Sequence, residues 1–218
     1  MDAYEKIIAY GSLKKALIKS CQGVMWKDSV ARYRLNAIKN TWRLRRDLLN
    51  HTYHLSPYCH FKVKEPKERD IDATCIRDRQ FQRSLCDNYL YDALCKGFIH
   101  DNCACQKGKG VSFAHQRMKT HLRRYFNKHG GEGWVLQCDI RKYFPSTPHN
   151  TAKDVIRKRV DDDRIYQHVV EIIDSFGGDH GIGLGSQTSQ LIELTVLDDI
   201  RPLCQRKAQN TPLYPLYG

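Results

Sequence analysis

Asp139 is the main candidate for a catalytic residue in this chain. It follows the run Val135-Leu136-Gln137-Cys138, which we expect to be part of a strand over 134–138, and Phe144 stands five positions after it. Transfer of a nucleotide uses two metal ions about 4 Å apart, held by carboxylates that converge from neighbouring strands. Asp139 is therefore a candidate metal ligand. An Asp at the end of a strand is also a common turn or helix-capping residue, and Phe144 could be a core residue beside Tyr143.

A glycine-rich turn, Gly181-Ile182-Gly183-Leu184-Gly185-Ser186-Gln187-Thr188-Ser189-Gln190, follows some forty residues later. Glycines allow a phosphate or base to approach the backbone closely, and the N-terminus of a following helix favours an anion. A helical pattern begins at Ser186, where Ser186 or Ser189 could be the N-cap. Glycines at this spacing also occur in ordinary turns, so the segment alone is a weak sign of a binding site.

A basic segment lies upstream of both features. Residues 60–64 alternate as a strand would, residues 65–70 form a charged turn, and residues 71–76 could return as the partner strand. This pattern predicts a basic β-hairpin that carries Lys64 and Arg69. Residues 106–110 add a glycine-containing basic loop.

The remaining elements, which must position these residues, are predicted to be helices. Apolar residues recur at helical spacing over 29–49 (Val30, Tyr33, Ile38, Trp42, Leu49), 78–98 (Phe81, Leu85, Tyr89, Leu90, Ala93, Leu94, Phe98) and 113–127 (Met118, Leu122, Tyr125, Phe126). Residues 151–160 and 164–176 form two more expected helices. The basic faces of 29–49 could be solvated or could form an arm that binds a nucleic-acid backbone.

Two groups of possible metal ligands have simpler explanations. Asp161-Asp162-Asp163 lies where the helix from 164 begins, and acidic residues are favoured in a first turn, so we interpret it as a cap. The nine cysteines have no paired Cys-x-x-Cys spacing, which predicts reduced thiols in the core. Cys103 and Cys105 are interpreted as ordinary thiols in a strand, and a metal site there is the less favoured alternative.

The net charge of the chain indicates which class of partner it binds. Lys and Arg outnumber Asp and Glu by 36 to 24 in 218 residues, a formal net charge of +12, which favours a polyanion such as nucleic acid. The chain has no apolar run long enough to span a bilayer and no start typical of a signal peptide, so we expect a cytoplasmic protein without a membrane partner.

Four segments in the same order resemble a bacterial or phage-type reverse transcriptase. They are Glu65–Ile71 with the following Ile76-Arg77-Asp78-Arg79-Gln80-Phe81-Gln82, the loop Cys105–Gly110, the Asp139 segment and the glycine-rich turn. The resemblance implies an α+β fold that comprises the fingers and part of the palm. It divides the chain into an N-terminal helical basic region (1–58), fingers (59–133), partial palm (134–200) and an aberrant tail (201–218).

The resemblance also implies roles for individual residues. Asp139 and the carbonyl of Ile140 would hold Mg²⁺ (or Mn²⁺), Arg69 with Lys64 would bind the incoming triphosphate, and Phe144 would exclude a sugar with a 2′-hydroxyl. Leu184, Gly185 and Gln190 would form the template-and-nucleotide loop, in the version typical of diversity-generating retroelements or an unclassified prokaryotic subgroup. The implied partners are an RNA template, a DNA or RNA primer and deoxynucleoside triphosphates.

The family would continue after Ile200 with a further helix and a hairpin bearing Tyr-x-Asp-Asp, which supplies the other catalytic carboxylates. Residues 201–218 have three prolines and no helical period. A one-nucleotide frameshift after Ile200 would explain this tail, because suitable synonymous codons permit a shifted reading that leads to Tyr-Met-Asp. Asp198 and Asp199 do not replace the missing carboxylates.

We therefore expect a reverse transcriptase fragment that is inactive alone, because one carboxylate cannot hold two metal ions. A non-catalytic RNA-binding remnant of a retroelement protein is the alternative. A basic scaffold protein with no nucleic-acid role is a third.

Overall fold

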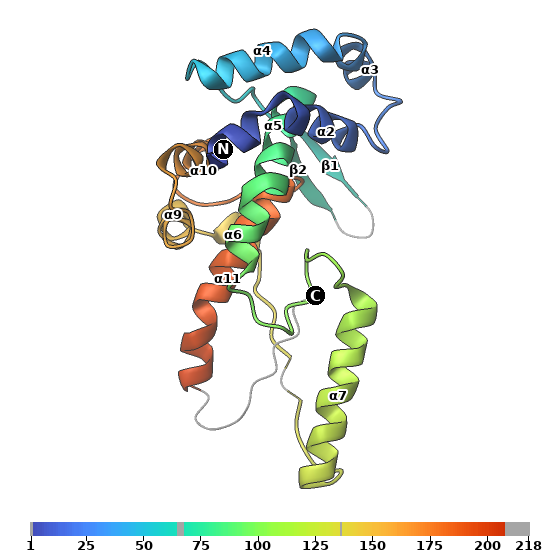
Figure 1. Ribbon diagram of the computed structural model, residues 1–218. Coiled ribbons are helices and arrows are strands. Elements are labelled where there is room, and N and C mark those ends of the chain that lie inside the picture. Colours follow the sequence, from blue (N-terminus) through green and yellow to red (C-terminus); the bar gives the residue numbers. More distant parts are fainter. Residues whose placement is uncertain (1, 65–67, 136, 208–218) are drawn as a thin grey trace.

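The computed structural model describes residues 2–64, 68–135 and 137–207, with side chains as far as Ile200. The fold is α+β, as expected, and Figure 1 shows a helical body with one hairpin. The helices are α1 (Ala3–Ile8), α2 (Tyr10–Ser20), α3 (Asp28–Leu35), α4 (Ala37–Leu49), α5 (Ile76–Leu85), the π-helical turn η1 (Cys86–Leu90), α6 (Tyr91–Cys95), α7 (Val111–His129), α8 (Tyr143–Ser146), α9 (His149–Arg157), α10 (Asp163–Asp174) and α11 (Gln187–Lys207). The strands are β1 (Cys59–Val63) and β2 (Arg69–Ala73).

The core forms around the continuous helical rod α5–η1–α6. Phe81, Leu85, Leu90 and Leu94 on this rod are all buried, and they pack with residues of α1, α4, α9, α10 and α11. Burying each such side chain contributes roughly 1.5–3 kcal/mol relative to leaving it exposed. The helix predicted over 78–98 is thus confirmed, with ends at Ile76 and Cys95 and a π-helical turn that periodicity does not reveal.

The helices predicted over 29–49 are confirmed as α3 and α4, but the buried face of α4 was predicted wrongly. Leu44 and Leu48 are buried, whereas Ile38 and Trp42 are exposed. Trp42 instead stacks on Tyr10 with ring centroids 5.2 Å apart. Apolar residues lie on two sides of α4, and packing against α2 and α5 decides which side is buried.

The predicted hairpin is present, with different ends. β1 and β2 are antiparallel and Val63 lies opposite Arg69, so Arg69 belongs to the strand and not to the turn. The second strand ends at Ala73, because Ile76 already begins α5. The turn residues 65–67 lie outside the described residues.

α7 confirms the helix predicted over 113–127, and it extends away from the helical body (Figure 1). The loop before α7 connects to it through Asp101, which pairs with Arg117 and accepts a 2.7 Å hydrogen bond from His121 Nε2. The expected core face of α7 is exposed at Met118, Leu122, Tyr125 and Phe126, in the part of the chain that the structure describes.

The strand predicted over 134–138 does not form in its described residues. Trp134 is fully exposed and Val135 is 77% exposed. A strand needs a neighbour for its backbone N–H and C=O groups, and residues 134, 135, 137 and 138, which the structure describes, belong to no sheet. Apolar composition was therefore insufficient to predict a strand here.

α9 and α10 confirm the two helices expected on either side of Asp161–Asp163. Asp162 is the N-cap of α10, and its side chain accepts hydrogen bonds from the backbone N–H groups of Arg164 and Ile165. The interpretation of the triplet as a cap is confirmed.

α11 begins after Ser186, whose hydroxyl oxygen accepts a 3.0 Å hydrogen bond from the Ser189 N–H, as an N-cap does. The helix continues to Lys207, which corrects our expectation that no helix follows Ile200. Asp198 forms an ion pair with Arg159, and Asp199 forms one with Lys158. These contacts lie just before the tail that begins at residue 201. Residues 208–218 of the tail lie outside the described residues. No described helix is long and apolar enough to cross a membrane.

Candidate functional site

The glycine-rich turn joins two segments that are distant in sequence. The N–H of Asp72 in β2 donates to the carbonyl of Leu184 (3.1 Å). On the other side, the N–H of Ile182 donates to the carbonyl of Phe144 (2.9 Å), and that of Gly181 to the carbonyl of Thr147 (2.8 Å). The hairpin, the turn after Asp139 and the glycine-rich turn therefore form one assembly.

Close packing explains why two positions in this turn are glycine. A Cβ atom on Gly183 would lie 2.4 Å from the Phe176 ring and 2.4 Å from Asp72 Oδ2. Gly185 has φ +124°, and a Cβ there would lie 3.2 Å from Ile71 Cγ2. These glycines let the turn lie against the hairpin, which is a structural role whether or not a ligand also binds there.

We predict that Gly183→Ala lowers the free energy of unfolding by about 1–3 kcal/mol, because the methyl group must displace an aromatic ring. Chemical denaturation of both proteins measures the difference. Gly11→Ala is the control: Gly11 lies inside α2 with nothing within 4 Å of the added Cβ, so this change should stabilise the chain by about 1 kcal/mol. Equal stability of Gly183→Ala and the unmodified chain would contradict the packing argument.

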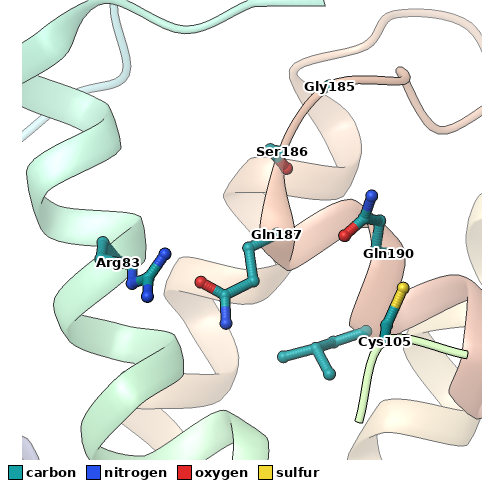
Figure 2. Close-up of a pocket in the computed structure, with 7 residues that line it drawn as sticks. Arg83, Cys105, Gly185, Ser186, Gln187 and Gln190 are labelled. Atoms are coloured by element: carbon teal, nitrogen blue, oxygen red, sulfur yellow. The ribbon is translucent and has the colours of Figure 1, made fainter. Parts of the chain in front are cut away.

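A pocket of about 310 Å³ opens where the turn meets α11. Its walls are Arg83, Cys105, Gly185, Ser186, Gln187, Gln190 and Leu191. Figure 2 shows the side chains of Arg83 and Gln187 pointing toward one another, with Cys105 near Gln190. Two residues predicted from the sequence, Gly185 and Gln190, therefore line a real cavity.

Sequence reasoning missed Arg83 and Gln187 as pocket residues. Arg83 lies on α5, and its Nε donates to Asp87 Oδ2 at 3.2 Å, so the guanidinium is held at the pocket wall. No sequence signal singled out Arg83, because α5 also carries Arg77, Asp78 and Arg79. The adjacent η1 turn brings Cys86 Sγ to 3.4 Å from Thr188 Oγ1, and π-helical turns are often found at functional sites.

Asp139 is not among the residues that line this pocket. Asp139 is exposed on irregular backbone, and Ile140 is also exposed. Lys142 has a left-handed conformation with φ 51° and precedes the short helix α8. The structure brings together the backbone of Phe144 and the glycine-rich turn, but it does not place the Asp139 carboxylate among the pocket residues.

Of the two aromatics after Asp139, Tyr143 is held against α11. Its hydroxyl donates to the carbonyl of Glu193 (2.7 Å), while Thr147 Oγ1 donates to Glu193 Oε2 (2.9 Å). Burial outweighs the hydrogen bonds from Thr147 and Tyr143, which lower the pKa of Glu193, so that this pKa is raised to about 7. A buried acid therefore lies directly beneath the turn that carries Phe144, whose half-buried ring meets Tyr143 edge to face.

The hairpin presents Arg69 and Lys64 at its distal end. Both side chains are exposed, and Lys64 directly follows the Val63–Arg69 pair. Arg69 has no carboxylate within 4 Å among the described residues, in contrast to Lys62, which pairs with Glu68 at 2.7 Å. Arg69 is thus available to an anion from outside the chain.

The described residues do not complete a metal site. They contain no group of three or more His, Cys, Asp or Glu side chains that could hold a metal ion. Asp139 is therefore a single carboxylate, and the donors of this chain as described do not fit the expected Mg²⁺ or Mn²⁺ pair. Asp198 and Asp199 are used in ion pairs, in agreement with our exclusion of them.

The cysteines with described side chains are free thiols. Cys21, Cys86 and Cys103 are buried as expected, but Cys59, Cys105 and Cys138 are exposed. The prediction that Cys103 and Cys105 lie in a strand is wrong: Cys105 has φ 52°, and the Cys103 thiol donates to the carbonyl of Asp101. In this segment the Ala104 N–H donates to Asn102 Oδ1 (3.1 Å), a local contact typical of a turn.

Comparison with known proteins finds structures with a similar fold but assigns the chain to no family. No protein-family model matches the chain, and no curated protein matches it. Among solved structures, the chain is similar to one from a "Partial Cas6-RT-Cas1--Cas2 complex" (TM-score 0.60, 15% identity), with 94% of this chain and 35% of that chain covered. A chain of a "Cas6-RT-Cas1--Cas2 complex" matches with the same TM-score, identity and coverage of this chain, and 22% of its own length.

The chain thus spans about a third or less of these neighbours, and at this identity the likeness concerns the fold alone. The fold is similar to that of chains that contain a reverse transcriptase (RT), in agreement with the resemblance found in the sequence.

Proposed function

We propose that this chain is the fingers and partial palm of an RNA-directed DNA polymerase. The main observation in support is that the glycine-rich turn contacts both the hairpin, at Asp72, and the turn that follows Asp139, at Phe144. Three segments that match reverse transcriptase motifs in sequence are therefore neighbours in space. The fold shared with RT-containing chains supports the same proposal.

The proposed roles follow the resemblance. Arg69, with Lys64 beside it, binds the triphosphate, since a guanidinium can hold phosphate oxygens with two parallel hydrogen bonds. Phe144 screens the sugar. Gly185 and Gln190 contact the template or nucleotide at the pocket of about 310 Å³, and Leu184 is in the position that suggests the diversity-generating or unclassified subgroup.

Asp139 and the carbonyl of Ile140 are the proposed metal ligands in a complete enzyme, where Mg²⁺ or Mn²⁺ would activate the primer hydroxyl. The described residues supply no second carboxylate beside Asp139. We therefore propose that the 218-residue chain binds primer–template without extending it. No catalytic step through the metal is assigned to this chain.

Primer extension tests this proposal. The purified chain is incubated with an RNA template, a DNA primer, Mg²⁺ and deoxynucleoside triphosphates, and binding of the same primer–template is measured in parallel. We expect binding without extension, and Asp139→Ala should not weaken binding, because it removes a charge that repels phosphate. Extension that Asp139→Ala abolishes would show a complete metal site and overturn the proposed inactivity.

The alternative, a non-catalytic RNA-binding remnant, is favoured by one observation, the absence of a metal-binding cluster among the described side chains. The nucleotide distinguishes the two functions. A polymerase fragment should hold primer–template more tightly when the next complementary deoxynucleotide is present, and Arg69→Gln should remove this effect. An RNA-binding remnant should show no such dependence.

A further inference from the structure

One face of α7 forms a stripe of polar and basic side chains. Gln116, Lys119, Thr120, Arg123, Arg124 and Asn127 recur at three- and four-residue spacing and line a shallow groove of about 590 Å³. At 1.5 Å per residue, this stripe extends for roughly 16 Å along the helix. We call these six residues the α7 stripe.

The charge of the α7 stripe is not compensated. Residues 102–131 contain seven Lys and Arg and no Asp or Glu. Lys119, Arg123 and Arg124 are exposed, and none of them has a carboxylate within 4 Å among the described residues. By contrast, the neighbouring Arg117 pairs with Asp101 and holds α7 to the preceding loop.

The composition of the stripe suits a phosphate backbone. The cations can neutralise phosphates, while the side-chain amides of Gln116 and Asn127 can donate neutral hydrogen bonds to phosphate or sugar oxygens. An anionic membrane surface would instead receive the opposite side of α7, where Met118, Leu122, Tyr125 and Phe126 are exposed. The polar amides share a face with the cations, so this face favours nucleic acid over lipid headgroups.

We propose that the α7 stripe is a binding surface for the sugar–phosphate backbone of the nucleic acid. The inference rests on the proposed function only in taking nucleic acid as the partner, and it extends the contact surface to a helix that none of the four motifs includes. Binding there is independent of base sequence, because the groups that the stripe offers match the backbone.

The test is the salt dependence of binding to a short fluorescein-labelled single-stranded RNA, followed by fluorescence anisotropy. The triple variant Lys119→Gln, Arg123→Gln, Arg124→Gln should bind about 10- to 100-fold more weakly at low salt. Its slope of log K against log salt concentration should be smaller in magnitude by about 2, since each phosphate contact with a single strand contributes about 0.7. Glutamine favours helix nearly as well as Lys and Arg do, so α7 should remain folded, which circular dichroism checks.

A matched control removes the same charge elsewhere. Lys6, Lys14 and Lys15 are exposed on α1 and α2 and have no ion pair among the described residues, so their triple change to Gln should leave the slope nearly unchanged. Equal losses in both variants, or an unchanged slope in the α7 variant, would overturn the inference. Absence of RNA binding by the unmodified chain, or binding only to vesicles of anionic lipid, would overturn it as well. Primer extension does not enter this test, so the two proposals can fail separately.

Discussion

Replacing Asp78 with Ala should lower the free energy of unfolding by about 3–5 kcal/mol, the cost typical of breaking a buried charged network. The Asp78 side chain is fully buried at the start of α5. It accepts hydrogen bonds from the Tyr53 hydroxyl (2.9 Å) and the Ser56 N–H (2.7 Å). Without the carboxylate, the buried Tyr53 hydroxyl and the partly buried Ser56 N–H both lose their acceptor.

Urea denaturation of the variant and of Asp92→Ala measures this effect. Asp92 is exposed on α6, so its loss should change the free energy of unfolding by less than about 0.5 kcal/mol. Similar small effects for both variants would show that the Asp78 hydrogen bonds do not stabilise the packing of the segment before β1 against α5.

Glu193→Gln should stabilise the chain above neutral pH by about 3 kcal/mol. Burial raises the pKa of Glu193 from 4.5 to about 7, so the folded chain binds this proton more tightly than the unfolded chain. Between these two pKa values the folded state holds more protons, and stability falls as pH rises. Gln cannot ionise, and its amide oxygen can still accept the hydrogen bond from Thr147.

The measurement is the difference in unfolding free energy between the variant and the unmodified chain at about pH 5 and about pH 8. The difference should grow from a small value to its full size over this interval, while other titrating groups cancel. Glu5→Gln on the exposed face of α1 provides the control and should show no growth with pH. A pH-independent difference for Glu193→Gln would contradict a raised pKa at this position.

Most helices of this chain could be predicted from the sequence because their buried residues recur at helical spacing along one face. Phe81, Leu85 and Leu94 recur at helical spacing on α5 and α6, and all are buried. The face of α4 could not be predicted, since apolar residues lie on two sides and tertiary packing selects one. The strand over 134–138 failed for a different reason: strand formation depends on a partner, which a local pattern does not contain.

The candidate site was predictable in its segments and not in its geometry. The positions of Gly185 and Gln190 indicated a binding loop, and both line the pocket. Arg83 joins the same pocket from α5, and only the three-dimensional packing of α5 against α11 brings it there. The apolar pattern predicted Asp139 at a strand end, whereas the structure places it on exposed irregular backbone, and it is not among the residues that line the pocket.

The central proposal is that the hairpin and the glycine-rich turn together form the site where the incoming nucleotide meets the template. Photo-crosslinking tests it most directly, with 4-thiouridine placed in the RNA template opposite the next incoming nucleotide of an annealed primer. Peptide mapping should locate the crosslinks in residues 69–73 and 181–190, and a primer placed farther along the template should lose them. Crosslinks confined to α3 and α4, or independent of the primer position, would contradict the proposed site.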